Sequence, residues 1–129
     1  MEELKRIMHV DDDESIRMIT SVTLESVGDF EVASCESGFD AQERFDGFQP
    51  QALLLDVMMP ELDGPGTLEA LKKQHDLGNI LVVFMTAKVQ KEEVDHLMEI
   101  GGFDVIEKPF DPMALAEKIQ SCWERFSAS

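Results

Sequence analysis

Two groups of carboxylates directly follow short apolar runs in this sequence. Asp56 follows the apolar residues 52–55, and three consecutive aspartates, residues 11–13, follow the run 7–10. An apolar run of this length beside turn residues is typical of a strand buried on both faces of a parallel sheet. Both groups are therefore predicted at the carboxyl ends of strands, which is the edge where open α/β sheets bind ligands.

The chemistry predicted for this edge is cation binding. If neighbouring strands bring Asp11, Asp12 and Asp56 together, like charges about 4 Å apart repel by up to about 4 kcal/mol at an effective dielectric near ~20. Such a cluster is poorly tolerated without a cation. Oxygen-only ligands of this charge favour Mg²⁺, which binds one or two carboxylates and keeps several waters or phosphate oxygens.

Two further strand ends carry residues suited to a phosphoryl group. The most continuous apolar run, residues 81–85, ends in Thr86 and Ala87, a hydroxyl followed by a very small side chain. The last predicted strand is followed by Lys108. A lysine beside carboxylates can pair with them and can neutralise an incoming phosphoryl group.

Strand and helix patterns alternate along the chain. Five strands are predicted at residues 4–10, 30–34, 51–55, 80–85 and 103–106, and a helix is predicted after each strand. Five βα units with short connections predict an α/β fold, a (βα)5 doubly wound parallel sheet with helices on both faces. With 129 residues and 43% apolar composition, residues 1–129 are expected to form a single domain.

Each helix is expected to bury one apolar stripe. Gly28 is predicted just beyond the first helix, Asp13 as a cap at its start, and Asp111 and Pro112 as the cap and first residue of the last helix. The stripes are Ile16, Ile19 and Val22; Ala41, Phe45 and Phe48; Leu68, Leu71 and His75; Val94, Leu97 and Met98; and Leu115, Ile119, Cys122 and Phe126.

Composition excludes several partners. The formal charge of −16 argues against binding a nucleic acid backbone, because no basic stripe is available to contact phosphates. The first residues lack the apolar core of a signal peptide, and no apolar stretch is long enough for membrane insertion. Cys35 and Cys122 are far apart and outside any CxxC motif, which favours a reduced, cytoplasmic location.

In chain order, the residues at the strand ends resemble the receiver domains of two-component response regulators. The resemblance covers residues 7–126 and implies a flavodoxin-like sheet with strand order 2-1-3-4-5. The residues that carry it are Asp11, Asp12, Asp56, Thr86, Ala87, Lys108 and Pro109.

The resemblance implies a phosphoacceptor and a metal site. Asp56 would form an aspartyl phosphate as a carboxylate nucleophile. Asp12, Asp56 and the backbone carbonyl of Met58 would bind Mg²⁺ directly, and Asp11 would act mainly through a bound water.

The resemblance also implies roles for the other two strand ends. Lys108 would hold the phosphoryl oxygens, Thr86 would move to hydrogen-bond them, and Ala87 would leave room and offer its backbone N–H. The domain would not be a conventional enzyme, but it would catalyse its own phosphorylation and dephosphorylation, mainly by positioning and charge neutralisation.

The implied partners are a sensor histidine kinase or a histidine phosphotransfer protein as donor, and a protein target on the face around the fourth helix, fifth strand and fifth helix.

The sequence departs from the family at one position in the fifth strand. Receiver domains usually have an aromatic residue there, whereas this chain has Val105, whose short branched side chain has no ring that could move between buried and exposed positions. Switching is therefore predicted to act mainly through residues 86–91 and the start of the fourth helix.

Two alternatives fit part of the pattern. An apolar strand followed by Asp-x-Asp is also found in haloacid-dehalogenase-like phosphatases, in which Asp11 would be the nucleophile. That class is disfavoured because no second acidic pair follows Lys108 at the matching place. A receiver that is never phosphorylated and serves only as a binding scaffold is disfavoured by the intact set of strand-end residues.

Overall fold

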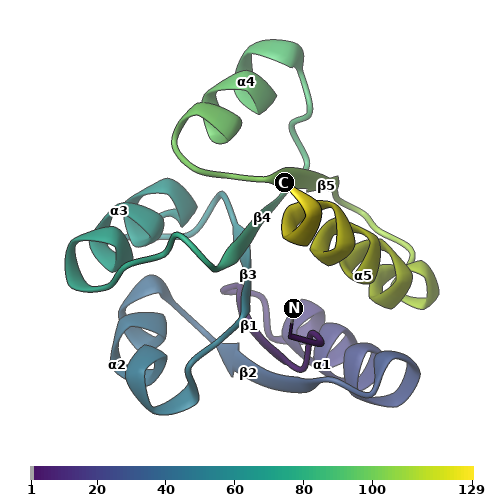
Figure 1. Cartoon of the computed structure of the whole chain (residues 1–129). Helices are drawn as coiled ribbons and strands as arrows, with labels where there is room; N and C mark the ends of the chain where they lie inside the picture. Colours follow the sequence, from purple (N-terminus) through teal and green to yellow (C-terminus); the bar gives the residue numbers. More distant parts are fainter. Residues whose placement is uncertain (1) are drawn as a thin grey trace.

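The structure of the chain is a computed structural model, and it describes residues 2–129. Strands run through the middle of Figure 1, with α1 and α5 on one side and α2 and α3 on the other. The elements are β1 (Arg6–Val10), α1 (Glu14–Gly28), β2 (Glu31–Cys35), α2 (Gly38–Phe48), β3 (Ala52–Asp56), α3 (Gly64–Gln74), β4 (Leu81–Thr86), α4 (Lys91–Glu99), β5 (Asp104–Glu107) and α5 (Pro112–Ala128).

The sheet is parallel throughout, and its order is β2-β1-β3-β4-β5, which confirms the strand order implied by the family resemblance. The predicted strand positions agree with the observed ones to within two residues. Val10 is in register with Leu55, and Asp56 is in register with Met85. The residues that follow β1, β3 and β4 therefore emerge side by side at one edge of the sheet.

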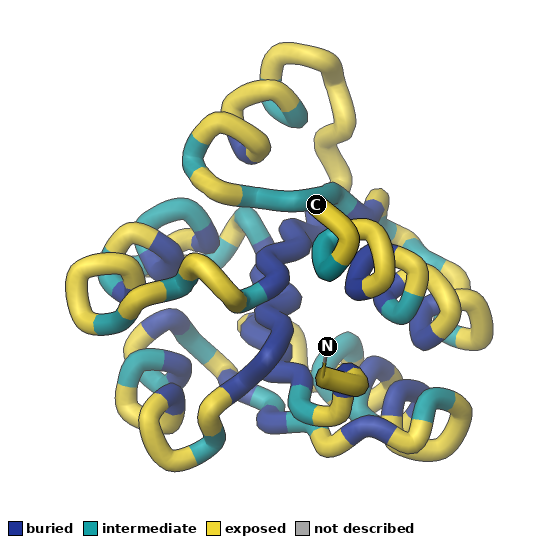
Figure 2. Tube along the Cα trace, viewed as in Figure 1, coloured by how far each residue is buried: buried dark blue, intermediate teal, exposed yellow. Residues whose placement is uncertain are grey.

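The central strand β3 is buried along its whole length, as the apolar run predicted. Leu54 packs with Leu24 and Ile119 in the layer of α1 and α5, whereas Leu53 packs with Phe45 in the layer of α2 and α3. Figure 2 shows this buried interior as a dark band along the strands. Two cores, one on each face, hold the sheet rigid beneath its functional edge.

The predicted core face of α1 is wrong. Ile19 is 43% exposed and Val22 is 54% exposed, whereas Thr20, Thr23 and Leu24 are buried. The two stripes share the same spacing of three to four residues and lie one residue, or about 100°, apart around the helix. Packing against the sheet selects the threonine stripe, so α1 presents its more apolar stripe to solvent.

The predicted C-terminal glycine of α1 is also misplaced. Gly28 is the last helical residue, and Asp29 takes the left-handed conformation, with φ of 58°. Gly28 is required for another reason, because a Cβ there would lie 2.4 Å from the ring of Phe30. At the starts of helices, Asp13 and Asp111 cap α1 and α5 as predicted.

Helix α4 is the most weakly anchored element. Of its nine residues, all of them described, Leu97 alone is buried, and Met98, predicted to face the core, is 40% exposed. Its N-cap residue Gln90 makes no side-chain capping bond. Figure 1 shows α4 at the top of the view beside the edge strand β5, and Figure 2 shows it largely exposed. None of the helices within residues 2–129 is long and apolar enough to cross a membrane.

Candidate functional site

The three predicted acids meet at the carboxyl edge of the sheet. Asp56 is the last residue of β3, and Asp11 and Asp12 begin the loop after β1. Each offers a carboxylate oxygen, and these oxygens all lie within 4.8 Å of one another. Asp11 and Asp56 are buried, while Asp12 is exposed. The cluster therefore has two buried carboxylates and one that is open to solvent.

Lys108 reaches this cluster from the end of the edge strand β5. It follows β5, and its backbone N–H donates to the carbonyl of Thr86 at the end of β4. From there the side chain reaches across the sheet edge, and its Nζ donates to Asp11 Oδ2 at 2.8 Å and to Asp56 Oδ1 at 3.0 Å. The lysine predicted to pair with the acids therefore bridges two of them.

Burial and charge crowding perturb the ionisation of these groups. Desolvation raises the pKa of Asp56 to about 6, and repulsion from Asp11 and Asp12 adds to the effect, while Lys108 opposes it. For Lys108, burial acts to lower the pKa, but the hydrogen bonds to Asp11 and Asp56 and the negative charges of these two residues together raise it. The cluster thus holds a firmly charged lysine beside a carboxyl that ionises with difficulty.

Hydrogen bonds fix Asp11 on both sides. Its Oδ1 accepts the backbone N–H of Asp13 at 2.9 Å, and its backbone carbonyl accepts a bond of 2.7 Å from Nη1 of Arg17. Because Oδ2 already accepts from Lys108, the carboxylate of Asp11 has little freedom to rotate. Arg17 is a supporting residue that sequence reasoning missed, since an arginine on the first helix carries no motif.

His9 is a second neighbour that the sequence did not single out. It lies on β1, it is fully buried, and its Nε2 is 3.9 Å from Asp11 Oδ2. Desolvation lowers the pKa of His9 to about 4, despite the attraction of Asp11. The ring is therefore neutral at neutral pH. In the sequence this histidine is a single polar residue within an apolar run, which gave no sign that it borders the site.

The loop after β3 packs tightly against the backbone of Asp56. The N–H of Gly64 donates to the carbonyl of Val57 at 3.0 Å, and a Cβ at Gly64 would lie 2.4 Å from the carbonyl oxygen of Asp56. Asp63 caps α3 by accepting from the N–H of Gly66. The glycines of this loop serve the turn and the helix start, and Gly64 lets the loop approach the backbone of Asp56 closely.

Thr86 and Ala87 lie at the same edge, at the end of β4 and just after it. Thr86 is buried, and its Oγ1 accepts the backbone N–H of Lys88 at 3.0 Å, while Ala87 is exposed. The hydroxyl is thus engaged within its own loop. Met58, two residues after Asp56, has a side chain that is 66% exposed.

The donor set fits a hard divalent cation. Asp11, Asp12 and Asp56 supply oxygen ligands only, and burial, with added repulsion from Asp11 and Asp12, raises the pKa of Asp56. Mg²⁺ prefers this kind of ligand and commonly takes one or two carboxylates. Lys108 now neutralises part of the same charge, so an ion and the lysine would share these oxygens.

Comparison with known proteins decides the family. The sequence model of the response regulator receiver domain matches residues 7–120. The chain belongs to the response regulator receiver family. It is 36% identical over 121 residues to "Probable transcriptional regulator ycf27" of Cyanophora paradoxa, covering 94% of this chain and 49% of the relative. The chain spans about half the length of the curated relatives it matches.

Solved receiver structures have the same fold. The chemotaxis protein CheY4 of Vibrio cholerae superposes with a TM-score of 0.85 at 25% identity, covering 93% of this chain and 99% of that one. A CheY-like receiver domain protein of Methanospirillum hungatei gives a TM-score of 0.83 at 27% identity, with 98% of each chain covered. The chain is thus a receiver domain of two-component signalling, as the sequence resemblance implied, and not a phosphatase of the dehalogenase type.

Proposed function

We propose that residues 1–129 form one receiver domain that accepts a phosphoryl group on Asp56. One observation carries the proposal: Lys108 Nζ bridges Asp56 and Asp11 at 3.0 and 2.8 Å at the carboxyl end of the central strand. The lysine lies where it can bind an oxygen of a phosphoryl group attached to Asp56. The buried strand beneath holds the nucleophile in a fixed position.

The transfer follows from these groups. A carboxylate oxygen of Asp56 attacks the phosphorus of a phosphohistidine, the P–O bond forms as the P–N bond breaks, and the departing imidazole nitrogen keeps the electron pair and then takes up a proton. Asp56 must be ionised to attack, and with a pKa of about 6 it is mostly ionised at pH 7. The ammonium group of Lys108 then stabilises the negative charge that develops on the phosphoryl oxygens.

Asp11, Asp12, Asp56 and the backbone carbonyl of Met58 would hold Mg²⁺. When bound, the ion supplies positive charge that offsets both the carboxylates and the phosphoryl oxygens. Asp12 is exposed and can receive a cation from solvent, whereas Asp11 is held by Lys108 and by the N–H of Asp13. These differences support direct ligation by Asp12 and a water-mediated role for Asp11.

Thr86 and Ala87 would complete the phosphoryl site. The hydroxyl of Thr86 would turn from the N–H of Lys88 and donate to a phosphoryl oxygen. The small side chain of Ala87 leaves space, and its backbone N–H adds a donor. The exchange replaces one local bond with a charge-assisted one, which is the stronger of the two.

The surface beside Lys108 supports docking of a phosphodonor. A cleft of about 320 Å³ lies there, lined by Ile16, Ile19, Ala87, Lys108, Pro109, Phe110 and Pro112. Met113, which follows the lining residue Pro112, is 68% exposed. A histidine kinase or phosphotransfer protein must cover Asp56 to react with it. The apolar side chains around this cleft would contact helices of that donor protein. The apolar stripe of α1 that faces solvent thereby gains a role.

The target would bind the face formed by α4, β5 and α5. Several curated relatives are named as transcriptional regulators. An output in transcription would require a DNA-binding segment other than this one, because the charge of −16 opposes contact with DNA phosphates. Two free, buried cysteines, Cys35 and Cys122, fit the cytoplasmic location that we infer.

Phosphorylation by a small donor tests the proposal. After incubation with acetyl phosphate and Mg²⁺, intact-mass and peptide analysis should find one acid-stable, base-labile phosphoryl group on Asp56. Asp56→Asn should abolish it, and Asp63→Asn, which changes a nearby loop carboxylate, should not. Modification of Asp11 instead would place the acceptor on the wrong carboxylate, and no modification of any carboxylate would leave only a binding scaffold.

A further inference from the structure

A second cleft lies on the opposite side of the site, between the loop after β3 and helix α4. Its volume is about 370 Å³, and its lining is mostly apolar. The lining residues are Val57, Met58, Pro65, Thr86, Lys88, Glu92, Glu93, His96 and Leu97. A neighbouring cleft shares Pro65 and His96 with it and continues along α3 toward Lys72 and Ile100. A groove therefore runs between α3 and α4, which Figure 1 shows as neighbouring helices.

The α4 side of this groove is acidic. Glu92 and Glu93 lie in the first turn of α4, and both line the cleft. The Oε2 atom of Glu93 is buried and accepts no hydrogen bond from residues 2–129. Lys88 and His96 border the same cleft, yet neither donates to this oxygen. A carboxylate oxygen removed from water without a donor is unfavourable, so a cation that reached it would be stabilised.

We propose that this cleft binds a basic side chain of a partner protein, with arginine favoured. The methylene groups of an arginine would lie on Val57, Pro65 and Leu97, while its guanidinium would pair with Glu93. A guanidinium is planar and weakly hydrated and can enter a partly apolar cleft more readily than an ammonium group. The net charge of −16 attracts such a partner over a longer range.

The position of the cleft gives the interaction a place in signalling. Thr86 forms part of its wall and also ends β4 beside the acids. Helix α4, which forms the other wall, is held by one buried residue, Leu97, so it can adjust to a bound side chain. This surface lies on the α3 side of α4 and is separate from the target face proposed above. Its existence does not depend on phosphorylation of Asp56.

A pair of small probes tests the charge requirement. The ¹⁵N-labelled protein, saturated with Mg²⁺ at pH 7, is titrated with n-butylguanidinium and with n-butylurea, which has nearly the same shape and no charge. Amide shifts should be confined to residues of the cleft, such as Thr86, Glu93 and Leu97, and should saturate with the guanidinium but not with the urea.

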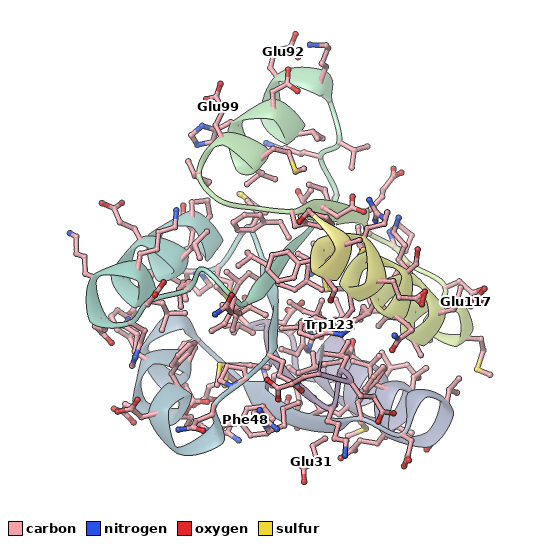
Figure 3. All side chains as sticks on the ribbon, in the orientation of Figure 1. Glu31, Phe48, Glu92, Glu99, Glu117 and Trp123 are labelled. Carbon is pink, nitrogen blue, oxygen red and sulfur yellow. The ribbon has the colours of Figure 1, made fainter. Side chains whose placement is uncertain are left out.

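Two variants separate the cleft from general attraction to an acidic protein. Glu93→Gln should weaken the apparent affinity for n-butylguanidinium by about fivefold, which is the loss expected for a partly exposed ion pair. Glu99→Gln removes the same charge from the end of α4, where the side chain projects outward (Figure 3), and should leave the affinity unchanged. Spectra of both variants check that they remain folded.

Four results would overturn the proposal: equal binding of the urea, wild-type affinity in Glu93→Gln, an equal loss in Glu99→Gln, or shifts centred on Asp11, Asp12 and Asp56. The last result would mean that the cation simply enters the metal site. No phosphoryl group takes part in the titration. Failure here therefore leaves the assignment of Asp56 as acceptor intact, and loss of phosphorylation leaves the cleft proposal intact.

Discussion

Asp56→Asn should make the metal-free protein more stable at neutral pH, although it removes a side chain that hydrogen-bonds to Lys108. The pKa of Asp56 is raised from 3.8 to about 6, first because the carboxyl is buried and then because Asp11 and Asp12 repel it. The folded protein therefore holds the proton of Asp56 more tightly than the unfolded chain does. Ionising this group on the way to pH 7 costs folding free energy, and a neutral amide avoids that cost.

The magnitude follows from the two pKa values. The stability that protonated Asp56 contributes is fully present below the unfolded pKa of 3.8 and is lost as pH rises through about 6. With these values, the ionised group destabilises the fold by about 3 kcal/mol at pH 7, by roughly half as much at pH 5 and by less than about 1 kcal/mol at pH 4. The attraction to Lys108 is already contained in the raised pKa. In the variant, Lys108 keeps its bond to Asp11.

Urea unfolding at pH 7, 5 and 4, in the presence of EDTA, measures this difference. The variant should exceed the wild type most at pH 7, and the two should converge at pH 4. Glu43→Gln is a matched control, because it removes one negative charge from the exposed surface of α2 and should change stability by less than about 0.5 kcal/mol at each pH.

Two outcomes would refute this reasoning. If Asp56→Asn were no more stable than the wild type at pH 7, burial would not raise the pKa of Asp56. If its advantage were the same at pH 7 and pH 4, the gain would come from some effect other than the charge of Asp56. An equal gain in Glu43→Gln would point to the overall negative charge of the protein.

Three further perturbations bear on the same site. Mg²⁺ at ten times its dissociation constant should stabilise the wild type by about 1.4 kcal/mol. Asp12→Ala should raise the metal-free melting midpoint, because it relieves repulsion, and should remove most of the Mg²⁺ response. Identical melting of the wild type with and without Mg²⁺ would rule out the metal site. Lys108→Met should cost about 3 kcal/mol in urea unfolding, because two buried carboxylates lose their cation, and no loss would show that they are not crowded. Beryllofluoride should change hydrogen exchange mainly in residues 86–91 and early α4; equally large changes across β5 and α5 would show that Val105 does not limit the switch.

The sheet and its functional edge could be predicted from sequence because parallel strands leave a direct signature. Residues buried on both faces of β3 must all be apolar, so the strand is visible as a run, and the first polar residue after it, Asp56, marks its carboxyl end. The convergence of Asp11 and Lys108 on Asp56 then depends on the strand order, which the family resemblance implied. The cap residues of α1 and α5 were predictable for a similar reason, since they act within one turn of chain.

Features that depend on packing between elements could not be predicted in this way. Helix α1 carries two stripes of equal period. A prediction based on hydrophobicity chooses the more apolar stripe, but that stripe faces solvent, because the buried threonines pack toward the sheet instead. His9 is visible in sequence only as one polar residue in a strand, whereas its burial beside Asp11 depends on the helices that cover it. The unpaired Oε2 of Glu93 likewise depends on where α4 lies.

The weak anchoring of α4 and the valine on β5 together suggest how a signal would leave the site. Val105 is in register with Phe84 and is half-buried, so no ring on β5 lies next to Thr86 to change position. The chain between Thr86 and α4 is exposed, and α4 itself has one buried residue. Rearranging this segment therefore disrupts few buried contacts, whereas moving β5 would break strand pairing with β4. A change at Thr86 should spread along the chain into α4, where both the acidic groove and the proposed target face can register it.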